Sequence, residues 1–304
     1  MRTIYKYNNV TWIDLESPNK EEIRELIEEY QVHPLVAEEL LVPTIRPKVD
    51  LYDDCIYLIL HFPSVVHSHS RHKSNEIDFI IGKNYIVTNH YESIDAIHQF
   101  SKIFEVNSIL NKSNMGDHSG YLLFYLLREL YKNLMEQLFD LDHNLKSIEE
   151  RIFRGEERAM VKTISHINRK LLTFKQAIQY HKGVLESFET AGRRFFGENF
   201  DYHLRSMLSE YHKVSSTLEG HRDTVNELRD TNDSLLSSKT NEIMKTLTIM
   251  AFIILPMTFV GQVFGVSLQN IPFQNSPNGF WIVIGLMAFV GVFGFSIFKY
   301  KKWL

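Results

Sequence analysis

The most constraining feature of this chain is a long segment near its C-terminus that has no ionisable side chain. From Thr246 to Phe298 there is no Asp, Glu, Lys, Arg or His. A bilayer core about 30 Å thick needs about 20 apolar residues per helix, so the segment is too long for one span and suits two. The stretch 265–279 is polar, uncharged and rich in Pro, Gly and Asn, and we predict it to be an extracytoplasmic loop. Transmembrane helices are therefore expected at 244–264 and 280–298.

Lysines lie just before the first predicted span and just after the second, whereas the loop between the spans has no positive charge. The lysines before the first span and after the second are Lys239, Lys245, Lys299, Lys301 and Lys302. The positive-inside rule then places both termini in the cytoplasm. We expect a multi-pass protein of the cell (inner) membrane, and a single cysteine fits a reducing cytosol.

The rest of the chain excludes several classes of function. All 37 acidic residues lie before residue 246, and an acidic soluble part argues against nucleic-acid binding, which depends on clustered Lys and Arg. No glycine-rich phosphate loop is found, so no nucleotide partner is expected. Met1–Val10 lacks the apolar core of a signal peptide. No catalytic constellation stands out, so we expect neither an enzyme nor a bound cofactor.

Residues 1–115 have the mixed pattern of an α+β domain, and we predict an α/β/α sandwich in the cytoplasm. Ser17-Pro18 is expected to supply the N-cap and the first residue of a helix. Gly82-Lys83-Asn84 is expected to join two strands in a hairpin. The predicted strands are 10–15, 48–53, 55–62, 76–81 and 85–90, and the predicted helices are 18–30, 34–41 and 93–104.

Residues 116–243 are predicted to form a stalk of long helices, because apolar residues recur three and four positions apart. The expected helices are 120–154, 157–191 and 201–264, followed after the second span by a basic cytoplasmic tail, 299–304. The third helix meets no proline until Pro256 and runs directly into the first span. One such helix encloses nothing, so we infer an oligomer.

A partly polar stripe follows one side of the first span if copies of that span surround an axis with a 3.5-residue period. Its members are Asn241, Met244, Thr248, Ala251, Leu255, Thr258 and Gln262. Towards the N-terminus the same period selects three acidic residues, Asp223, Glu227 and Asp230. An acidic approach that leads to rings of uncharged oxygen groups suits a divalent cation. Hydrogen bonding between helices would use the same groups, and the spacing leaves both interpretations open.

Several motifs in register resemble one family. The segment Ser238–Thr248, SKTNEIMKTLT, followed by Pro256-Met257-Thr258-Phe259, resembles the first-span signature of CorA-type magnesium transporters. The ending Lys301-Lys302-Trp303-Leu304 is similar to CorA endings. Trp12-Ile13-Asp14, His33-Pro34-Leu35 and Arg46-Pro47-Lys48-Val49 recur in the order that CorA proteins use. The resemblance therefore covers essentially the whole chain.

This resemblance implies a homopentamer in the lipid bilayer, with a funnel-shaped cytoplasmic domain and one pore built from five copies of the first span. It assigns Asn241 to a polar ring on the cytoplasmic side and Met244 and Leu255 to a hydrophobic gate. It assigns Thr258 to a polar ring deeper in the membrane. The period count selects the same four positions.

Two segments depart from the family pattern. The family closes its first span with Gly-Met-Asn, whose asparagine carbonyls bind a hydrated cation, whereas this chain has Gly265-Val266-Ser267. Mg²⁺ dehydrates reluctantly and serine lacks the amide carbonyl, so the selectivity mouth is altered. Gln262, one turn inside, is either a replacement carbonyl ring or an interhelical hydrogen-bonding group. Ser206 and Ser209 replace two aspartates of the family's Mg²⁺-sensing segment, which predicts a weakened or absent sensor.

Three histidines crowd one polar segment between predicted strands. They are His67, His69 and His72. Imidazole suits Zn²⁺, Ni²⁺ and Co²⁺, so a metal site is one interpretation. Solvated histidines on a loop are the other.

The stripe and the resemblance together favour a CorA-type channel for passive Mg²⁺ uptake. The altered mouth and the histidines keep Zn²⁺, Co²⁺ or Ni²⁺ as alternative cations. Loss of the Gly-Met-Asn motif and of the sensing aspartates also fits a sensor or membrane scaffold that conducts no ion. A flux assay separates a scaffold from a channel.

Replacing Ser267 by Asn should raise the preference for Mg²⁺ over Zn²⁺ or Co²⁺ severalfold, because the substitution restores a ring of amide carbonyls at the outer mouth. The measurement is the ratio of initial uptake rates in liposomes, with Ser267→Ala as the control that adds no carbonyl. An unchanged ratio in Ser267→Asn would show that this position does not select the cation.

Overall fold

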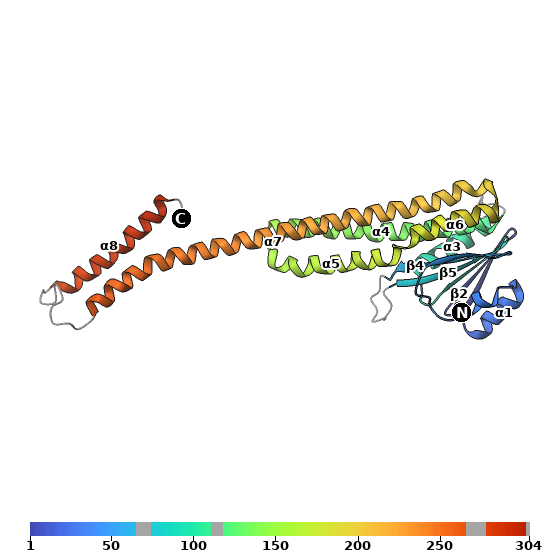
Figure 1. The fold of residues 1–304 in the computed structure, drawn as a ribbon, viewed down its shortest axis with the longest axis horizontal. Helices are drawn as coiled ribbons and strands as arrows, with labels where there is room; N and C mark the ends of the chain where they lie inside the picture. The colour runs from blue at the N-terminus through green and yellow to red at the C-terminus, as the bar shows by residue number, and fades with distance from the viewer. Residues whose placement is uncertain (65–73, 111–117, 266–277, 302–304) are drawn as a thin grey trace. The chain divides into compact units, whose positions relative to one another are not determined.

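The computed structural model describes residues 1–64, 74–110, 118–265 and 278–301 (Figure 1). The chain forms two compact units, Met1–Arg229 and Asp230–Leu304. The finer boundaries expected from the sequence stay predictions.

A six-stranded mixed sheet forms the centre of the first unit, in the order β1-β2-β6-β5-β4-β3. Its strands are β1 Arg2–Tyr7, β2 Val10–Glu16, β3 Lys48–Leu51, β4 Ile56–Pro63, β5 Ser74–Ile81 and β6 Tyr85–His90. The β2–β6 pair is parallel and the other pairs are antiparallel. The predicted hairpin between β5 and β6 is confirmed. Strand β1 was not predicted, because only Tyr7 in it is buried and it lacks a clear alternation of apolar and polar residues.

Helices cover both faces of this sheet, as the predicted α/β/α sandwich requires (Figure 1). On one face α1 and α2 pack against alternate strand residues such as Ile13, Tyr57 and Val87. On the other face Trp12 packs against Phe100 and Phe104 of α3. The helices of this unit are α1 Lys20–Tyr30, α2 Pro34–Glu39, α3 Asp95–Leu110, α4 Ser119–Phe153, α5 Glu157–Ile178, α6 His181–Phe196, the short 3₁₀ helix η1 Glu198–Phe200 and the beginning of α7 Asp201–Gly265.

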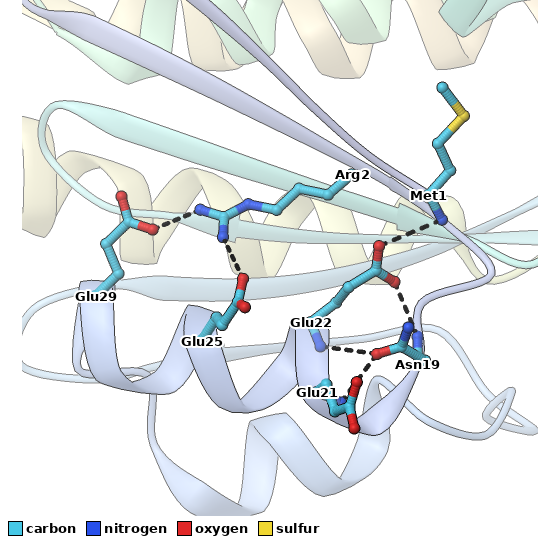
Figure 2. A network of polar contacts seen from close by, with 7 residues as sticks. All are labelled: Met1, Arg2, Asn19, Glu21, Glu22, Glu25 and Glu29. Carbon is cyan, nitrogen blue, oxygen red and sulfur yellow. Dashed lines mark hydrogen bonds and ion pairs between the residues drawn. The ribbon is translucent and has the colours of Figure 1, made fainter.

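The N-cap of α1 is Asn19, so the expectations of Ser17 as N-cap and Pro18 as the first helical residue were wrong. Asn19 Oδ1 accepts from the amides of Glu21 at 2.9 Å and Glu22 at 2.8 Å. The Glu22 side chain accepts from the Asn19 amide at 3.0 Å, which completes a capping box (Figure 2). Ser17 instead adopts a φ of 45° and donates its hydroxyl to the carbonyl of Tyr91.

Ion pairs tie the edge strand β1 to α1. Arg2 reaches Glu25 at 3.2 Å and also pairs with Glu29, and the Met1 ammonium lies 3.6 Å from Glu22 (Figure 2). The hydrogen bond from Arg2 lowers the pKa of Glu29. Because the carboxylates of Glu25 and Glu29 are largely exposed, each of their pairs with Arg2 contributes only about 0.2–1 kcal/mol.

The single helix expected at 157–191 was wrong, because α5 and α6 are separate helices joined at Gln179 and Tyr180. No Pro or Gly marks this break. The cause is tertiary: the ring of His181 is fully buried and lies 2.8 Å from both the Tyr131 hydroxyl and the His61 carbonyl. Burial lowers the pKa of His181 to about 3, so the ring is neutral. Nε2–H therefore donates to the carbonyl, and Nδ1 accepts from Tyr131.

A buried carboxyl group interrupts the apolar surface of the sheet beneath α2. Asp78 is paired in register with Ile59 and Asn89, and Asn89 Nδ2 donates to it at 2.8 Å. Asp78 and Asn89 are fully buried. Burial, and then the charge of nearby Glu76, raises the pKa of Asp78 well above its ordinary value. The site therefore favours the neutral acid.

Replacing Asp78 by Asn should stabilise the protein, and more so as the pH rises. A raised pKa means that the folded chain keeps a proton that the unfolded chain releases. Stability is therefore lost as the pH increases from the unfolded pKa towards the folded one, at about 1.4 kcal/mol per unit of pKa difference. Asparagine has no such proton to lose. The thermal midpoint of the full chain in detergent, followed from about pH 5 to 9, should depend less on pH in this variant.

The matched control is Asp53→Asn, because Asp53 is exposed on the same domain. It should keep the pH dependence of the parent. If Asp78→Asn also keeps it, Asp78 is ionised in the fold.

Candidate functional site

Two of the described helices are long and apolar enough to cross a membrane. They are the helical stretch Glu198–Gly265, which includes α7, and α8, Gly279–Tyr300. The predicted spans at 244–264 and 280–298 fall within them. The C-terminal part of α7 and the whole of α8 belong to the same compact unit, Asp230–Leu304.

A seam of partly covered residues joins α7 to α8. On α7 the covered positions recur every three or four residues at Ile249, Ile253, Met257, Val260, Gly261 and Phe264. On α8 they are Val283, Met287, Val290, Gly291, Gly294 and Phe298. Three antiparallel contacts lie within this seam: Met257 with Gly291, Gly261 with Met287, and Ile253 with Gly294. The largely exposed ring of Phe252 also approaches Phe298, with ring centroids 6.3 Å apart. These contacts define the side of α7 that α8 occupies.

The predicted stripe lies on the other side of α7. All of its residues are exposed in the single chain, namely Asn241, Met244, Thr248, Ala251, Leu255, Thr258 and Gln262. Because successive residues are about 100° apart around an α-helix, the centre of the stripe lies roughly 180° from the centre of the seam. Helix α8 therefore leaves the stripe uncovered. That the stripe lines a pore stays a prediction.

The hydroxyl groups of the stripe are held by the backbone of their own helix. Thr248 Oγ1 donates to the carbonyl of Met244, and Thr258 Oγ1 to that of Leu255, both at 2.8 Å. Because each hydroxyl proton is already donated, the oxygen atom is left as an acceptor for water or a cation. Pro256 lies within α7 and has no amide hydrogen, so the carbonyl of Phe252 loses its donor four residues on.

The acidic residues expected at the approach to the pore are all exposed on α7. Asp223, Glu227 and Asp230 keep the spacing that the sequence suggested. Ser206 and Ser209, at the positions of the family's sensing aspartates, are half-buried and exposed, respectively. Their part in approach or sensing stays a prediction.

Several predicted site residues lie outside the described part of the chain. They are Val266, Ser267, His67, His69 and His72, so only Gly265 of the predicted mouth is described. Among the described residues there is no group of three or more His, Cys, Asp or Glu side chains arranged to hold a metal ion.

Sequence reasoning missed a small polar cavity in the cytoplasmic unit. It has a volume of about 90 Å³, and its lining includes His61, Asn75, Glu76 and Glu92. Glu76 is buried and accepts from the Thr44 amide at 2.7 Å, with His61 Nε2 3.2 Å away. No sequence pattern indicated this grouping, because its members come from separate strands and loops.

Comparison with known proteins shows relatives along nearly the whole chain. The family model described as CorA-like Mg²⁺ transporter protein matches residues 7–301. The chain is 25% identical to the cobalt/magnesium transport protein CorA of Thermotoga maritima, over 97% of this chain and 83% of that protein. It is 30% identical to the divalent cation transporter CmaX of Pseudomonas aeruginosa, over 29% of this chain and 26% of that protein. The complete structure of the CorA magnesium transporter from Methanocaldococcus jannaschii has the same fold, with a TM-score of 0.84 and 20% identity over 99% of this chain and 93% of that one.

Threonines on opposite sides of α7 test the stripe with one substitution. Thr248→Val should reduce cation uptake several-fold, because it removes an oxygen atom from the stripe. Thr246→Val should leave uptake unchanged, since Thr246 lies near the seam side and its hydroxyl donates to the Glu242 carbonyl at 3.0 Å in the same way. Both variants lose one hydroxyl–backbone bond, so stability effects are matched. Initial uptake rates in liposomes decide the matter, and equal rates in the two variants would contradict the assignment of the stripe.

Proposed function

The chain belongs to the family of CorA-like Mg²⁺ transporter proteins, and from this premise we propose that it admits Mg²⁺ passively through a homopentameric pore. The coarser function, divalent cation transport of the CorA type, follows from membership across nearly the whole chain. Both termini are proposed to lie in the cytoplasm, on the basis of the flanking lysines.

The observation that carries the proposal is the division of α7 into two opposite sides. One side is occupied by α8, and the other bears the uncovered stripe. An uncovered side that carries oxygen groups at Asn241, Thr248, Thr258 and Gln262 is suited to face an axis shared with other copies. Lipid is a poor alternative neighbour for Gln262, which lies within the predicted span, because an unsatisfied amide is costly in hydrocarbon.

The proposed path has three parts. Asp223, Glu227 and Asp230 raise the local concentration of cations at the cytoplasmic approach. Asn241 forms a polar ring, and Met244 and Leu255 form the hydrophobic gate beyond it. Exposed fractions of 57% and 66% leave both of these apolar side chains free to meet their counterparts in other copies. A hydrophobic constriction of this kind closes by excluding water.

The outer part of the path would bind the cation through its hydration shell. Thr258 and Gln262 provide a hydroxyl and an amide ring on the same side of α7, ahead of Gly265, Val266 and Ser267. Mg²⁺ gives up its bound water reluctantly. Oxygen atoms that accept hydrogen bonds from this water therefore suit the ion better than a tight cage of direct ligands. Inward movement of a doubly charged ion gains about 4.6 kcal/mol per 100 mV, so no nucleotide is needed.

The choice of cation is the open part of the proposal. Mg²⁺ is favoured by the family, and Co²⁺, Zn²⁺ or Ni²⁺ is the alternative because Ser267 replaces the usual asparagine. A relative named as a cobalt/magnesium transport protein is consistent with either ion. A sensor or scaffold without flux is the alternative of a different class.

Purified protein in liposomes tests this function directly. Entry of Mg²⁺, Zn²⁺, Co²⁺ and Ni²⁺ is followed with an ion-sensitive dye at several internal Mg²⁺ concentrations. Mg²⁺ entry supports the proposal, and insensitivity to internal Mg²⁺ would indicate a lost sensor. Entry of transition metals without Mg²⁺ favours the alternative cations, and no entry of any ion favours the scaffold.

Replacing Asn241 by Leu should abolish uptake in the same assay, because it removes the polar ring and extends the hydrophobic gate. Asn241→Gln, which keeps the amide, should retain measurable uptake. Undiminished transport in Asn241→Leu would mean that this residue does not line the path.

A further inference from the structure

We propose that two reciprocal methionine–glycine contacts between α7 and α8 are positioning contacts that set the rotation of the pore helix. Met257 of α7 lies on Gly291 of α8, and Met287 of α8 lies on Gly261 of α7. The proposal rests on the proposed function, since it concerns which side of α7 faces the pore.

The first contact has room for a larger residue only if the Met257 side chain shifts by a few tenths of an ångström. A Cβ atom on Gly291 would lie 3.0 Å from Sδ of Met257, 3.5 Å from Cε and 3.9 Å from Cγ. The distance to sulfur is shorter than an ordinary van der Waals contact, so one side must move. The second contact is closely packed but not overfilled, because a Cβ on Gly261 would lie 3.6 Å from Cε of Met287.

The two contacts are related by the antiparallel arrangement of the helices. Met257 and Gly261 are four residues apart on α7, and Met287 and Gly291 are four residues apart on α8. Each helix therefore presents a methionine and a glycine on one face, one turn apart. The methionine of each helix meets the glycine of the other. Two such contacts restrict the rotation of α7 about its own axis, relative to α8, more than one contact does.

Packing of this kind is what can hold helices together in lipid. Lipid tails are as apolar as the helices, so close van der Waals contact at small residues replaces the hydrophobic effect. Methionine is unbranched and polarisable, and it fills the space over a glycine closely. Two other glycines of α8 have no methionine partner: a Cβ atom on Gly285 would have nothing within 4 Å, and one on Gly294 would lie 3.6 Å from Cγ1 of Ile253.

Rotation of α7 matters because two adjacent residues compete for the pore side. Thr258 and Phe259 lie on either side of the centre of the stripe, about 100° apart. Phe259 is 66% exposed, so α8 does not restrain it. A modest rotation of α7 decides whether a hydroxyl group or a phenyl ring faces the axis. Met257 directly precedes Thr258 and Phe259, so its contact with Gly291 is adjacent to the residues whose orientation it would set.

Cysteine labelling measures this rotation without relying on ion flux. Thr258→Cys and Phe259→Cys are introduced separately into the full chain, and a charged methanethiosulfonate reagent is applied to the reconstituted protein. The only native cysteine, Cys55, is buried, and burial raises the pKa of its thiol to about 11, so it reacts little. The quantity compared is the ratio of labelling rates at positions 258 and 259.

Gly291→Ala should change this ratio severalfold, because the added methyl group overlaps the sulfur of Met257. Gly285→Ala is the matched control on the same helix and should leave the ratio as in the parent. An unchanged ratio in Gly291→Ala overturns the proposal.

If Gly291→Ala does not assemble, Met257→Ala alone serves, because it removes the contact without adding volume. It should bring the two labelling rates closer together, and a ratio equal to that of the parent overturns the proposal. A shifted ratio in a protein without cation uptake supports the positioning contacts and overturns the transport function. Cation uptake together with an unshifted ratio supports the transport function and overturns the positioning contacts.

Discussion

Close packing of α8 on one side of α7 is the constraint on which the membrane part of this protein depends. In lipid there is no gain from burying one apolar side chain against another, so the two helices must be held by contact between closely fitting surfaces. The contacts of Met257 with Gly291 and of Met287 with Gly261 provide such surfaces. Because they use one side of α7, the polar groups on the other side are left for neighbours of a different kind.

The cytoplasmic unit is stabilised by a different principle. There water drives apolar residues of the sheet under helices on both faces, and polar groups inside must be satisfied one by one. His181 does so by hydrogen bonding to the Tyr131 hydroxyl and to the carbonyl of His61. His61 lies near the end of β4, two residues past Ile59, which pairs with the first residue of β3. Asp78 is accommodated in its neutral form, with one oxygen accepting from Asn89 Nδ2 on the neighbouring strand. His181 thus links a helix to the sheet, whereas Asp78 pairs within the sheet.

The sequence predicted most of this fold because its strongest signals are local. The strand and hairpin signals between Lys48 and His90, and the run of α7 through Pro256, depend on residues near each other in the chain. Failures arose where a distant group decided the outcome. Ser17 and Asn19 are both good N-caps, and the Tyr91 carbonyl takes the hydroxyl of Ser17. The break before His181 depends on Tyr131 and on the end of β4.

For the candidate site, periodicity could select one side of α7 but could not say where α8 packs. The seam at Met257 and Gly261 required the structure, although the glycines of the second span were visible in the sequence. Val266 and Ser267 lie outside the described residues, so the mouth stays a prediction from residue types alone.

Pro256 gives the proposed pore helix a requirement for hydration. The carbonyl of Phe252 lacks the amide partner that any other residue at position 256 would supply. An unpaired carbonyl surrounded by hydrocarbon costs several kcal/mol, whereas one that water reaches costs little. A wet axis beside α7 would supply that water, and a dry gate would withdraw it. Opening and closing would then change the hydrogen bonding of the helix itself, so that the backbone as well as the side chains would respond to the wetting of the pore.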